Sequence, residues 1–446
     1  MTETSLKRLL GGVRQGAWRV AARTPDERDR YADLIRVVAI LVVVYGHWMV
    51  AVVLVDDGEL VTTQLLVVEP WTRVATWVAQ VMPLFFLVGG RVNAGSLRRA
   101  QEAGLSTSAW VRKRSRRLLR PMLPLLALWV PLGPVLALAG VAEGLLEVAI
   151  ETAFIPLWFF VVYLLVIVLA PVTWWLHRRF GLWLLPLGAV LVAAVDALDR
   201  ADVPGVGQAN YLLVFGLAHQ LGYLWAQERL PVGPRALHLA WAGLGAALGL
   251  VALLGYPGSM VGLQADADSN ATPPTLALLA LTVAQLGVVL AARRPVTAWL
   301  HRHPLPWAAV ASLGTAIITI FLWHMSVLVV VASLTHLTGW WPEMTEIDRL
   351  WWSLRPVWLA LCTLALVPLV LVFRGFEGAG DPVPGGPATT VVGVAATAGG
   401  LGFILREGLY DADRALGLPL MALGLLAIGL VCLGIHHREG RELDGT

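Results

Sequence analysis

The chain has 446 residues, of which 57% are hydrophobic and 14% are charged. The charged share is about half that of an average soluble domain, and with a mean hydropathy of +0.71 it excludes a soluble globular protein. The net charge of +3 is small and its cations gather in alternate loops, which excludes nucleic acid as a partner. The two cysteines, Cys362 and Cys432, each lie in an apolar run, so no disulfide framework and no cysteine metal site are expected. We also expect no bound cofactor.

Apolar runs follow a basic N-terminal segment, residues 1–33. The first run is too long for a signal-peptide core and lacks a small-residue cleavage site, so it predicts a retained helix. Backbone groups must pair within each crossing of the hydrocarbon, so every apolar run of about 20 residues predicts a helix. We expect twelve spans, at 34–55, 71–90, 118–140, 154–176, 181–198, 209–226, 237–255, 274–292, 307–335, 350–373, 389–405 and 415–435. The predicted fold class is an all-α polytopic membrane protein.

A Gly/Pro-rich linker at 374–388 divides these spans into a ten-helix core at 34–373 and two additional helices at 389–435, before a tail at 436–446. Lys and Arg gather in the N-terminal segment, in alternate loops and in the tail, whereas the opposite loops carry acids. Cation-rich loops are typical of the cytoplasmic side. We therefore expect a multi-pass protein of the plasma (inner) membrane with both termini in the cytoplasm.

The first span, RYADLIRVVAILVVVYGHWMV, carries two ionisable residues, Arg36 and His47. Such groups are costly inside a bilayer and often mark functional sites. Their separation of eleven residues is close to three helical turns, which places them within about 20° of one helix face and about 16 Å apart. Arg36 can instead snorkel to lipid phosphates. His47 lies deeper and is either a hydrogen-bonded core histidine or a proton-transfer group.

Arg117 and Arg120 lie one helical turn apart in WVRKRSRRLLRPMLP, where the third span enters the membrane. The other cations of this segment are typical of a cytoplasmic anchor. Arg117 and Arg120 can turn inward and offer bidentate guanidinium groups to a phosphorylated ligand. This segment is therefore a candidate site for an anionic co-substrate.

Two later spans carry further candidates. His324 in IFLWHMSVL has a predicted depth similar to that of His47, so the two histidines are expected at one level. Trp158 in FIPLWFFVVYLL lies near that level, or belongs to an interfacial aromatic belt. Arg355 begins the tenth span, where snorkelling or surface pairing explains it.

With these residues the chain resembles the membrane acyltransferase-3 family, which includes O-antigen and peptidoglycan O-acetyltransferases. Arg36 and His47 reproduce its Arg-x10-His pattern, and PLFFLVGG resembles its phenylalanine-rich segment that ends in glycine. RRLLRPMLP resembles its Arg-x-x-Arg stretch before a proline, while LWFFVVYLL and IFLWHMSVL resemble its Trp-Phe and Trp-His segments. The five motifs occur in order over residues 30–373. Val88 and Arg91 depart from the pattern, in which serine often precedes the glycine and an apolar residue commonly follows it.

The resemblance implies transfer of an acyl group from cytoplasmic acyl-CoA, usually acetyl-CoA, to a hydroxyl of a sugar, glycan or glycolipid at the outer face. We expect a neutral His47 to act as general base, with a covalent acyl-histidine as an alternative. His324 and Trp158 would shape the site or polarise the thioester carbonyl, and Arg117, Arg120 and Arg36 would hold the CoA phosphates and the pantetheine end. The expected partners are the lipid bilayer, acyl-CoA and the acceptor.

Two alternatives belong to other classes of protein. A secondary or proton-coupled transporter would use the buried Arg and His residues to relay protons and bind solute. It predicts inverted repeats with interrupted helices, and the two halves of the sequence show no clear similarity. A non-catalytic membrane scaffold would leave the ionisable pair of the first span without a purpose.

Overall fold

The computed structural model describes residues 15, 18–25, 28–56, 59–262, 268–378 and 385–435. Helices dominate these residues, and the only sheet among them is a two-stranded hairpin. Eight helices are long and apolar enough to cross a membrane. The prediction of an all-α polytopic membrane protein is confirmed.

The chain forms two compact units and passes between them several times. Unit 1 comprises residues 1–43, 73–92 and 180–317, and unit 2 comprises residues 44–72, 93–179 and 318–446. Five elements continue from one unit into the other, namely α2 (Arg30–Val50), the 3-10 helix η1 (Pro70–Ala75), α5 (Met82–Glu102), α9 (Leu157–Phe180) and, by its first residue, α15 (Ile317–Leu337). Elements of unit 1 are α4 (Thr76–Ala79), η2 (Gly181–Trp183), α10 (Leu184–Asp199), η3 (Val206–Gln208), α11 (Ala209–Ala226), η4 (Gly233–Ala236), α12 (Leu237–Leu254), α13 (Leu276–Arg302) and α14 (Pro304–Gly314).

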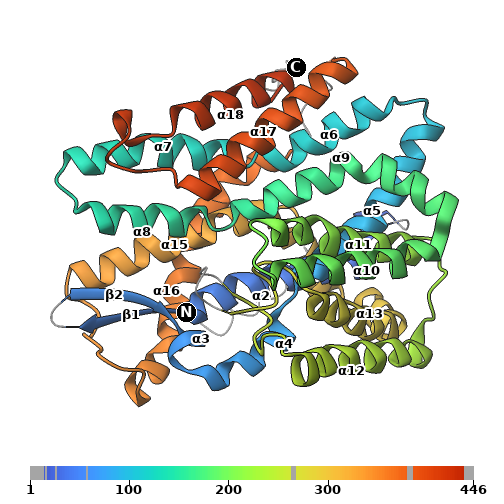
Figure 1. The fold of residues 1–446 in the computed structure, drawn as a ribbon, viewed down its shortest axis with the longest axis horizontal. Helices are drawn as coiled ribbons and strands as arrows, with labels where there is room; N and C mark the ends of the chain where they lie inside the picture. The colour runs from blue at the N-terminus through green and yellow to red at the C-terminus, as the bar shows by residue number, and fades with distance from the viewer. Residues whose placement is uncertain are drawn as a thin grey trace. The chain divides into compact units, whose positions relative to one another are not determined.

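Unit 2 holds the hairpin and the C-terminal helices (Figure 1). Its elements are β1 (Ala51–Asp56), β2 (Glu59–Gln64), α3 (Leu65–Val68), α6 (Thr107–Leu119), α7 (Met122–Leu138), α8 (Glu143–Phe154), α15 (Ile317–Leu337, from its second residue), α16 (Arg349–Phe373), η5 (Arg374–Glu377), α17 (Pro387–Glu407), η6 (Ala415–Gly417) and α18 (Leu420–Cys432).

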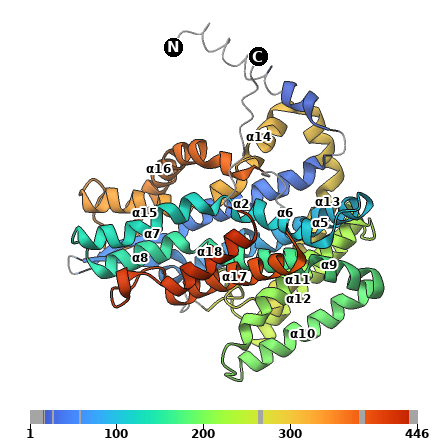
Figure 2. The same cartoon turned by 90° about the horizontal axis from the view of Figure 1, so that it is seen from above.

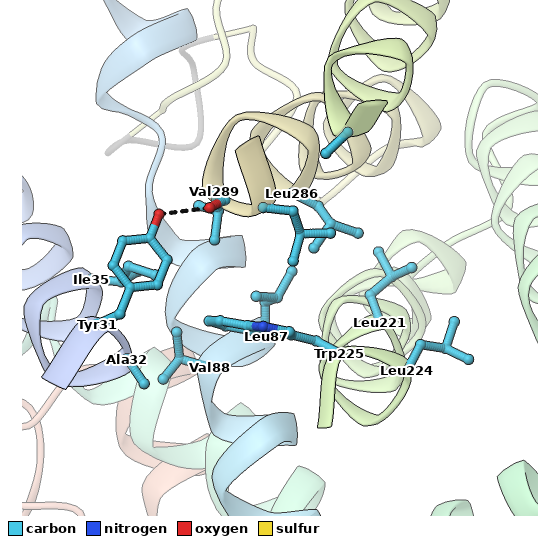
Figure 3. Close-up of a cluster of buried hydrophobic side chains, with 12 residues drawn as sticks. Tyr31, Ala32, Ile35, Leu87, Val88, Leu221, Leu224, Trp225, Leu286 and Val289 are labelled. Atoms are coloured by element: carbon cyan, nitrogen blue, oxygen red, sulfur yellow. Dashed lines mark hydrogen bonds between the residues drawn. The ribbon is translucent and has the colours of Figure 1, made fainter. Parts of the chain in front are cut away.

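Unit 1 is held together by a buried cluster shared by α2, α5, α11 and α13 (Figure 3). Tyr31 donates a hydrogen bond from its hydroxyl to the carbonyl of Val289 at 2.6 Å, which closes α2 onto α13. Val88, which departs from the family pattern, is completely buried in this cluster beside Trp225. An apolar residue at position 88 therefore contributes to helix packing.

Gly90 and Arg91 follow in α5 and have different tasks. A side chain at Gly90 would collide with the backbone carbonyl of His219, so glycine allows α5 and α11 to approach closely. Arg91 donates to Asp29 at 2.7 Å, and its guanidinium carbon lies 4.6 Å from the centre of the Trp225 ring. This departure from the family pattern thus forms an ion pair within unit 1.

The two C-terminal helices dock onto α6 through one buried arginine. α17 and α18 lie side by side in both views (Figures 1 and 2), and α17 also contacts α6. Arg112 donates hydrogen bonds to the hydroxyls of Thr389 and Thr390 at 2.7 and 2.8 Å and to the carbonyl of Cys432 at 2.8 Å. The interpretation of Arg112 as a simple lipid anchor is therefore wrong, because its guanidinium joins three helices of unit 2.

The first helix ends earlier than predicted. α2 ends at Val50 rather than at residue 55, and residues 51–56 form β1, which pairs with β2 in antiparallel register from Ala51 with Gln64 to Asp56 with Glu59. The run AVVLV is rich in β-branched residues, which pack well on a pleated strand. The backbone N–H of Val55 also donates to the carbonyl of Met344 at 2.8 Å, which ties the hairpin to the α15–α16 connection.

Three other predicted elements are interrupted or extended. The span at 71–90 is broken at Gln80, after which α5 continues to Glu102. The span at 118–140 bends by 50° between α6 and α7, where Pro121 cannot donate a helical hydrogen bond. The span at 307–335 is two helices, α14 and α15. In addition, α8 falls almost wholly between the predicted spans at 118–140 and 154–176.

The described residues contain fewer qualifying spans than the twelve predicted. The count rises from eight to nine when the bent pair α6 and α7 is taken as one span. Residues 143–199 count as a single helical run although they cover two predicted spans. α11, which contains Asn210, His219 and Gln220, and the 13-residue α18 are not counted.

Candidate functional site

His47 and His324 meet in unit 2. His47 lies in the last turn of α2, and His324 lies in the second turn of α15. His47 Nδ1 is 2.8 Å from His324 Nε2, and the ring centroids are 5.0 Å apart with an interplanar angle of 28°. The structure therefore brings together the two histidines that the sequence placed at one level, although they are 277 residues apart.

The hydrogen bonds of this pair fix the roles of the ring nitrogens. His324 Nδ1 lies 2.5 Å from the carbonyl oxygen of Phe321, which can only accept, so Nδ1 carries the proton. In a neutral His324 the other nitrogen, Nε2, must then accept, and His47 Nδ1 must donate to it. The remaining nitrogen, His47 Nε2, keeps a free lone pair. It is the basic atom of the pair.

The two rings differ in exposure in a way that suits this arrangement. His324 is completely buried, whereas His47 is half-buried. Trp48 donates from Nε1 to the carbonyl of His324 at 2.9 Å, and Trp358 donates from Nε1 to the carbonyl of Trp48 at 3.2 Å. These bonds hold the backbone around both histidines. His324 is therefore the fixed inner ring, and His47, which is half-buried, is the accessible outer ring.

Aromatic residues of α9 pack against Phe321, whose ring lies 5.6 Å from that of His324. Phe159 packs edge-on against Phe321 at 5.2 Å between centroids, and Phe160 lies 6.1 Å from the same ring. Trp158 is half-buried and packs edge-on against Phe159 at 6.3 Å. The segment LWFFVVYLL therefore supports Phe321, whose carbonyl orients His324, and Phe159 and Phe160 are the residues of this segment that sequence analysis did not single out.

Arg117 and Arg120 lie at the bend between α6 and α7. Arg117 is exposed and Arg120 is half-buried, so both can reach a ligand at this end of unit 2. Arg112 and Arg116, which precede them in α6, are buried. The basic segment thus separates into structural arginines on one face of α6 and accessible arginines at its C-terminal end.

Glu377 is a further residue of this region that the sequence did not reveal, because it falls in the predicted linker at 374–388. Its carboxylate accepts hydrogen bonds from the backbone N–H and the hydroxyl of Thr319 at 2.6 and 2.7 Å, and it interacts electrostatically with Arg117. Thr319 lies in the first turn of α15, so a carboxylate here satisfies free N–H groups of the helix start. Glu377 connects a predicted donor-binding residue to the helix of His324.

Arg36 belongs to unit 1, where it lies 3.8 Å from Asp33 and stacks over the ring of Phe85 at 5.7 Å. α2 is continuous from Arg30 to Val50, so the spacing of eleven residues places Arg36 and His47 about 16 Å apart along one helix. The weak geometry of the Asp33 pair leaves most of the guanidinium donors available to a ligand.

Arg355 is buried, with 7% of its surface exposed, which contradicts the expectation of a snorkelling or surface-paired side chain. Its guanidinium carbon lies 3.5 Å from the ring centre of Trp351 and 5.7 Å from that of Trp358. Aromatic faces attract cations, and this attraction is strongest where water is excluded. No pattern in the sequence indicates this packing, because the tryptophans of α16 are equally typical of an interfacial belt.

Unit 1 contains a separate pocket lined by Glu228, Arg293, Arg294 and Thr297 with apolar neighbours. Arg293 pairs with Glu228 at 3.6 Å. Neither Arg293 nor Arg294 was a candidate site residue from the sequence. In the part of the chain that the structure describes, no group of three or more His, Cys, Asp or Glu side chains could hold a metal ion.

Comparison with known proteins matches the region that contains this site to one protein family. A family model described as an acyltransferase domain, acyltransferase 3, matches residues 29–374, which include both histidines, Arg36, Arg117 and Arg120. No curated protein and no solved structure matches the chain.

Proposed function

The chain belongs to the acyltransferase-3 family, and we propose that it transfers an acyl group, with acetyl as the first candidate, from cytoplasmic acyl-CoA to a hydroxyl at the outer face of the membrane. The acceptor would be a sugar, a glycan or a glycolipid. The observation that carries the proposal is the His47–His324 pair, which leaves a free lone pair on an accessible imidazole. That arrangement suits transfer to oxygen, because a hydroxyl must lose its proton as it attacks.

His47 Nε2 would act as the general base. As the acceptor oxygen attacks the thioester carbonyl, its proton moves to Nε2, and the carbonyl becomes a tetrahedral oxyanion. Collapse of this intermediate breaks the carbon–sulfur bond, and the departing CoA sulfur takes the proton back from Nε2. His47 is unchanged after one turnover, and the products are an ester and CoA.

His324 would orient the base and stabilise its charged form. When Nε2 of His47 is protonated, Nδ1 still donates to His324 Nε2, and His324 in turn donates to the Phe321 carbonyl. Such a chain fixes the tautomer of the base in the same manner as the third member of a catalytic triad. An acyl-histidine at His47 Nε2 is a second route with the same residues, in which the acyl group pauses on the ring before the acceptor attacks.

The donor would bind where arginines are accessible. Arg117 and Arg120 can each offer paired N–H groups to the phosphates of CoA, a geometry that guanidinium provides and ammonium does not. Arg36, on the same helix as His47, would contact the pantetheine end. Trp158 would shape the acyl path beside Phe159.

The cation-rich ends of the spans would face the cytoplasm, with both termini on that side and the protein in the plasma (inner) membrane. In this orientation acyl-CoA reaches the arginines from the compartment where it is made. The acyl group would cross while CoA remains inside.

The test measures release of CoA and transfer of label from labelled acetyl-CoA to a set of sugar and glycolipid acceptors by the purified protein. His47→Ala should remove acceptor-dependent CoA release, and His238→Ala, at an exposed histidine of α12, is the matched control. Label on wild-type protein that is absent from His47→Ala would select the acyl-histidine route. Normal transfer by His47→Ala would contradict the proposal.

A further inference from the structure

A small pocket of unit 2 lies outside the five family motifs. Three tryptophans, Trp341, Trp351 and Trp358, form its aromatic wall, and Arg355 and His336 are the ionisable residues among the described residues that line it. The remaining wall comes from the hairpin and the α15–α16 connection. The interior of the pocket has room for about one water molecule, so only the charged tip of a ligand enters it and a sugar ring stays outside.

We propose that this pocket binds an anionic group of the acyl acceptor, a carboxylate or a phosphate, and that Arg355 is the residue that binds it. The inference rests on the proposed function, because that function defines what an acceptor is. It narrows the acceptor to a class: sugars or glycolipids that carry a negative charge near the hydroxyl to be acylated.

Arg355 is a buried cation without an anionic partner among the described residues. The side chain is more than nine-tenths buried, and among the described residues no carboxylate pairs with it and no acceptor atom takes a hydrogen bond from it. The rings of Trp351 and Trp358 stabilise the charge, but they leave the N–H edges of the guanidinium without acceptors. A buried cation in this state is costly unless an anion completes its surroundings.

The residues around Arg355 do not supply that anion. His336 and Cys362 are the titratable groups that interact with it electrostatically, and neither carries a negative charge at neutral pH unless the thiol ionises. A thiol is mostly uncharged at neutral pH, so Cys362 does not supply the anion. A ligand carboxylate or phosphate, with two oxygens that match the planar fork of arginine, would provide the missing partner.

The pocket is connected to the segment that carries His47. Trp358 lines the pocket, and its Nε1 donates to the backbone carbonyl of Trp48, the residue after His47. An acceptor whose charged group is held by Arg355 is therefore anchored beside the segment that carries the base. Beyond the pocket wall, Trp341 packs against exposed Trp340, and Trp351 packs against Trp352, which gives a ring-bearing ligand an aromatic surface to lie on.

The experiment measures sugar binding in the absence of acyl-CoA, so its outcome does not depend on acyl transfer. The full chain is purified in an uncharged polyoxyethylene detergent, which contains neither sugar nor phosphate, and saturation-transfer NMR compares glucuronic acid and glucose 1-phosphate with glucose. We expect at least one anionic sugar to bind about tenfold or more tightly than glucose, since a charged hydrogen bond to a buried group has that effect. Arg355→Gln should remove this difference.

Arg349→Gln is the matched control, because Arg349 lies on the same helix and is exposed. Arg355→Lys keeps the charge without the planar fork and should bind the anionic sugar with intermediate affinity. Equal binding of anionic and neutral sugars by the wild type, a comparison that needs no variant, would overturn the proposal, as would unchanged anion preference in Arg355→Gln. Binding of added phosphatidylglycerol, but of neither anionic sugar, would also overturn it and make the pocket a lipid phosphate site.

Discussion

The carboxylate of Glu377 accepts two hydrogen bonds from Thr319, one from the backbone N–H and one from the hydroxyl. Thr319 lies in the first turn of α15, and His324 follows five residues later on the same helix. The acid therefore holds the start of the helix that presents the inner histidine. It does so from η5, the segment that follows α16, so a residue just beyond the matched family region (residues 29–374) supports the candidate active site.

Replacing Glu377 by alanine should destabilise the protein and reduce acyl transfer together. Loss of a carboxylate at a helix N-terminus costs about 0.5–2 kcal/mol, and a displaced α15 would move His324 away from His47. Thermal unfolding in detergent and CoA release measure the two effects. Glu377→Gln, which keeps one acceptor oxygen, should retain part of both, and Glu346→Ala, at an exposed acid, should change neither. Full activity of Glu377→Ala would show that α15 does not need this support.

The two histidines should act as a unit. If His324 works only by orienting His47, the double variant His47→Ala/His324→Ala should be no slower than His47→Ala alone, whereas two independent contributions would multiply. The measurement is the rate of label transfer for the wild type, both single variants and the double variant. A double variant slower by the product of the single effects would contradict the hydrogen-bonded chain as the basis of catalysis.

Arg117 and Arg120 should affect the donor more than the acceptor. Arg117→Gln and Arg120→Gln are each expected to raise KM for acetyl-CoA about tenfold, because a charged hydrogen bond to phosphate contributes about 1.5–3 kcal/mol. KM for the acceptor should stay near its wild-type value. Lys113→Gln, an exposed cation of the same helix, is the control. An increase confined to the acceptor KM would remove these residues from the donor site.

Arg112 should hold the C-terminal helix pair in place. Arg112→Ala leaves the hydroxyls of Thr389 and Thr390 and the carbonyl of Cys432 without their donor, and we expect a lower unfolding temperature and faster proteolysis between α17 and α18. Lys113→Ala serves as the control. Unchanged proteolysis of Arg112→Ala would show that helix packing alone docks the pair.

Gly90 should tolerate no side chain. Gly90→Ala pushes a methyl group into the backbone carbonyl of His219, and overpacking of this kind costs about 1–3 kcal/mol. Gly144→Ala in α8 meets open space and should be neutral or stabilising, because alanine favours a helix over glycine by about 0.5–1 kcal/mol. Thermal unfolding of the two variants makes the comparison. Equal unfolding temperatures would mean that α5 and α11 can separate without cost.

The sequence by itself determined the class of fold and the family. Apolar runs of membrane-spanning length predict helices because the bilayer offers no partners for backbone groups, and that constraint is local to each run. The Arg-x10-His spacing also needs nothing beyond one helix, since α2 alone sets the separation of Arg36 and His47. The prediction was least accurate at helix ends, because a helix end also depends on contacts with other segments: the β-branched run after Val50 forms β1, which pairs with β2.

Tertiary structure decided the relationships between distant segments. The partner of His47, the capping of α15 by Glu377 and the burial of Arg355 each depend on residues separated by tens to hundreds of positions, and no local pattern encodes such contacts. An arginine near a helix end looks the same in sequence whether it snorkels or packs between tryptophans. Only the packing of neighbouring helices determines whether lipid, protein or a ligand surrounds it, because hydrophobic pattern specifies which segments cross the membrane and not which side chains meet there.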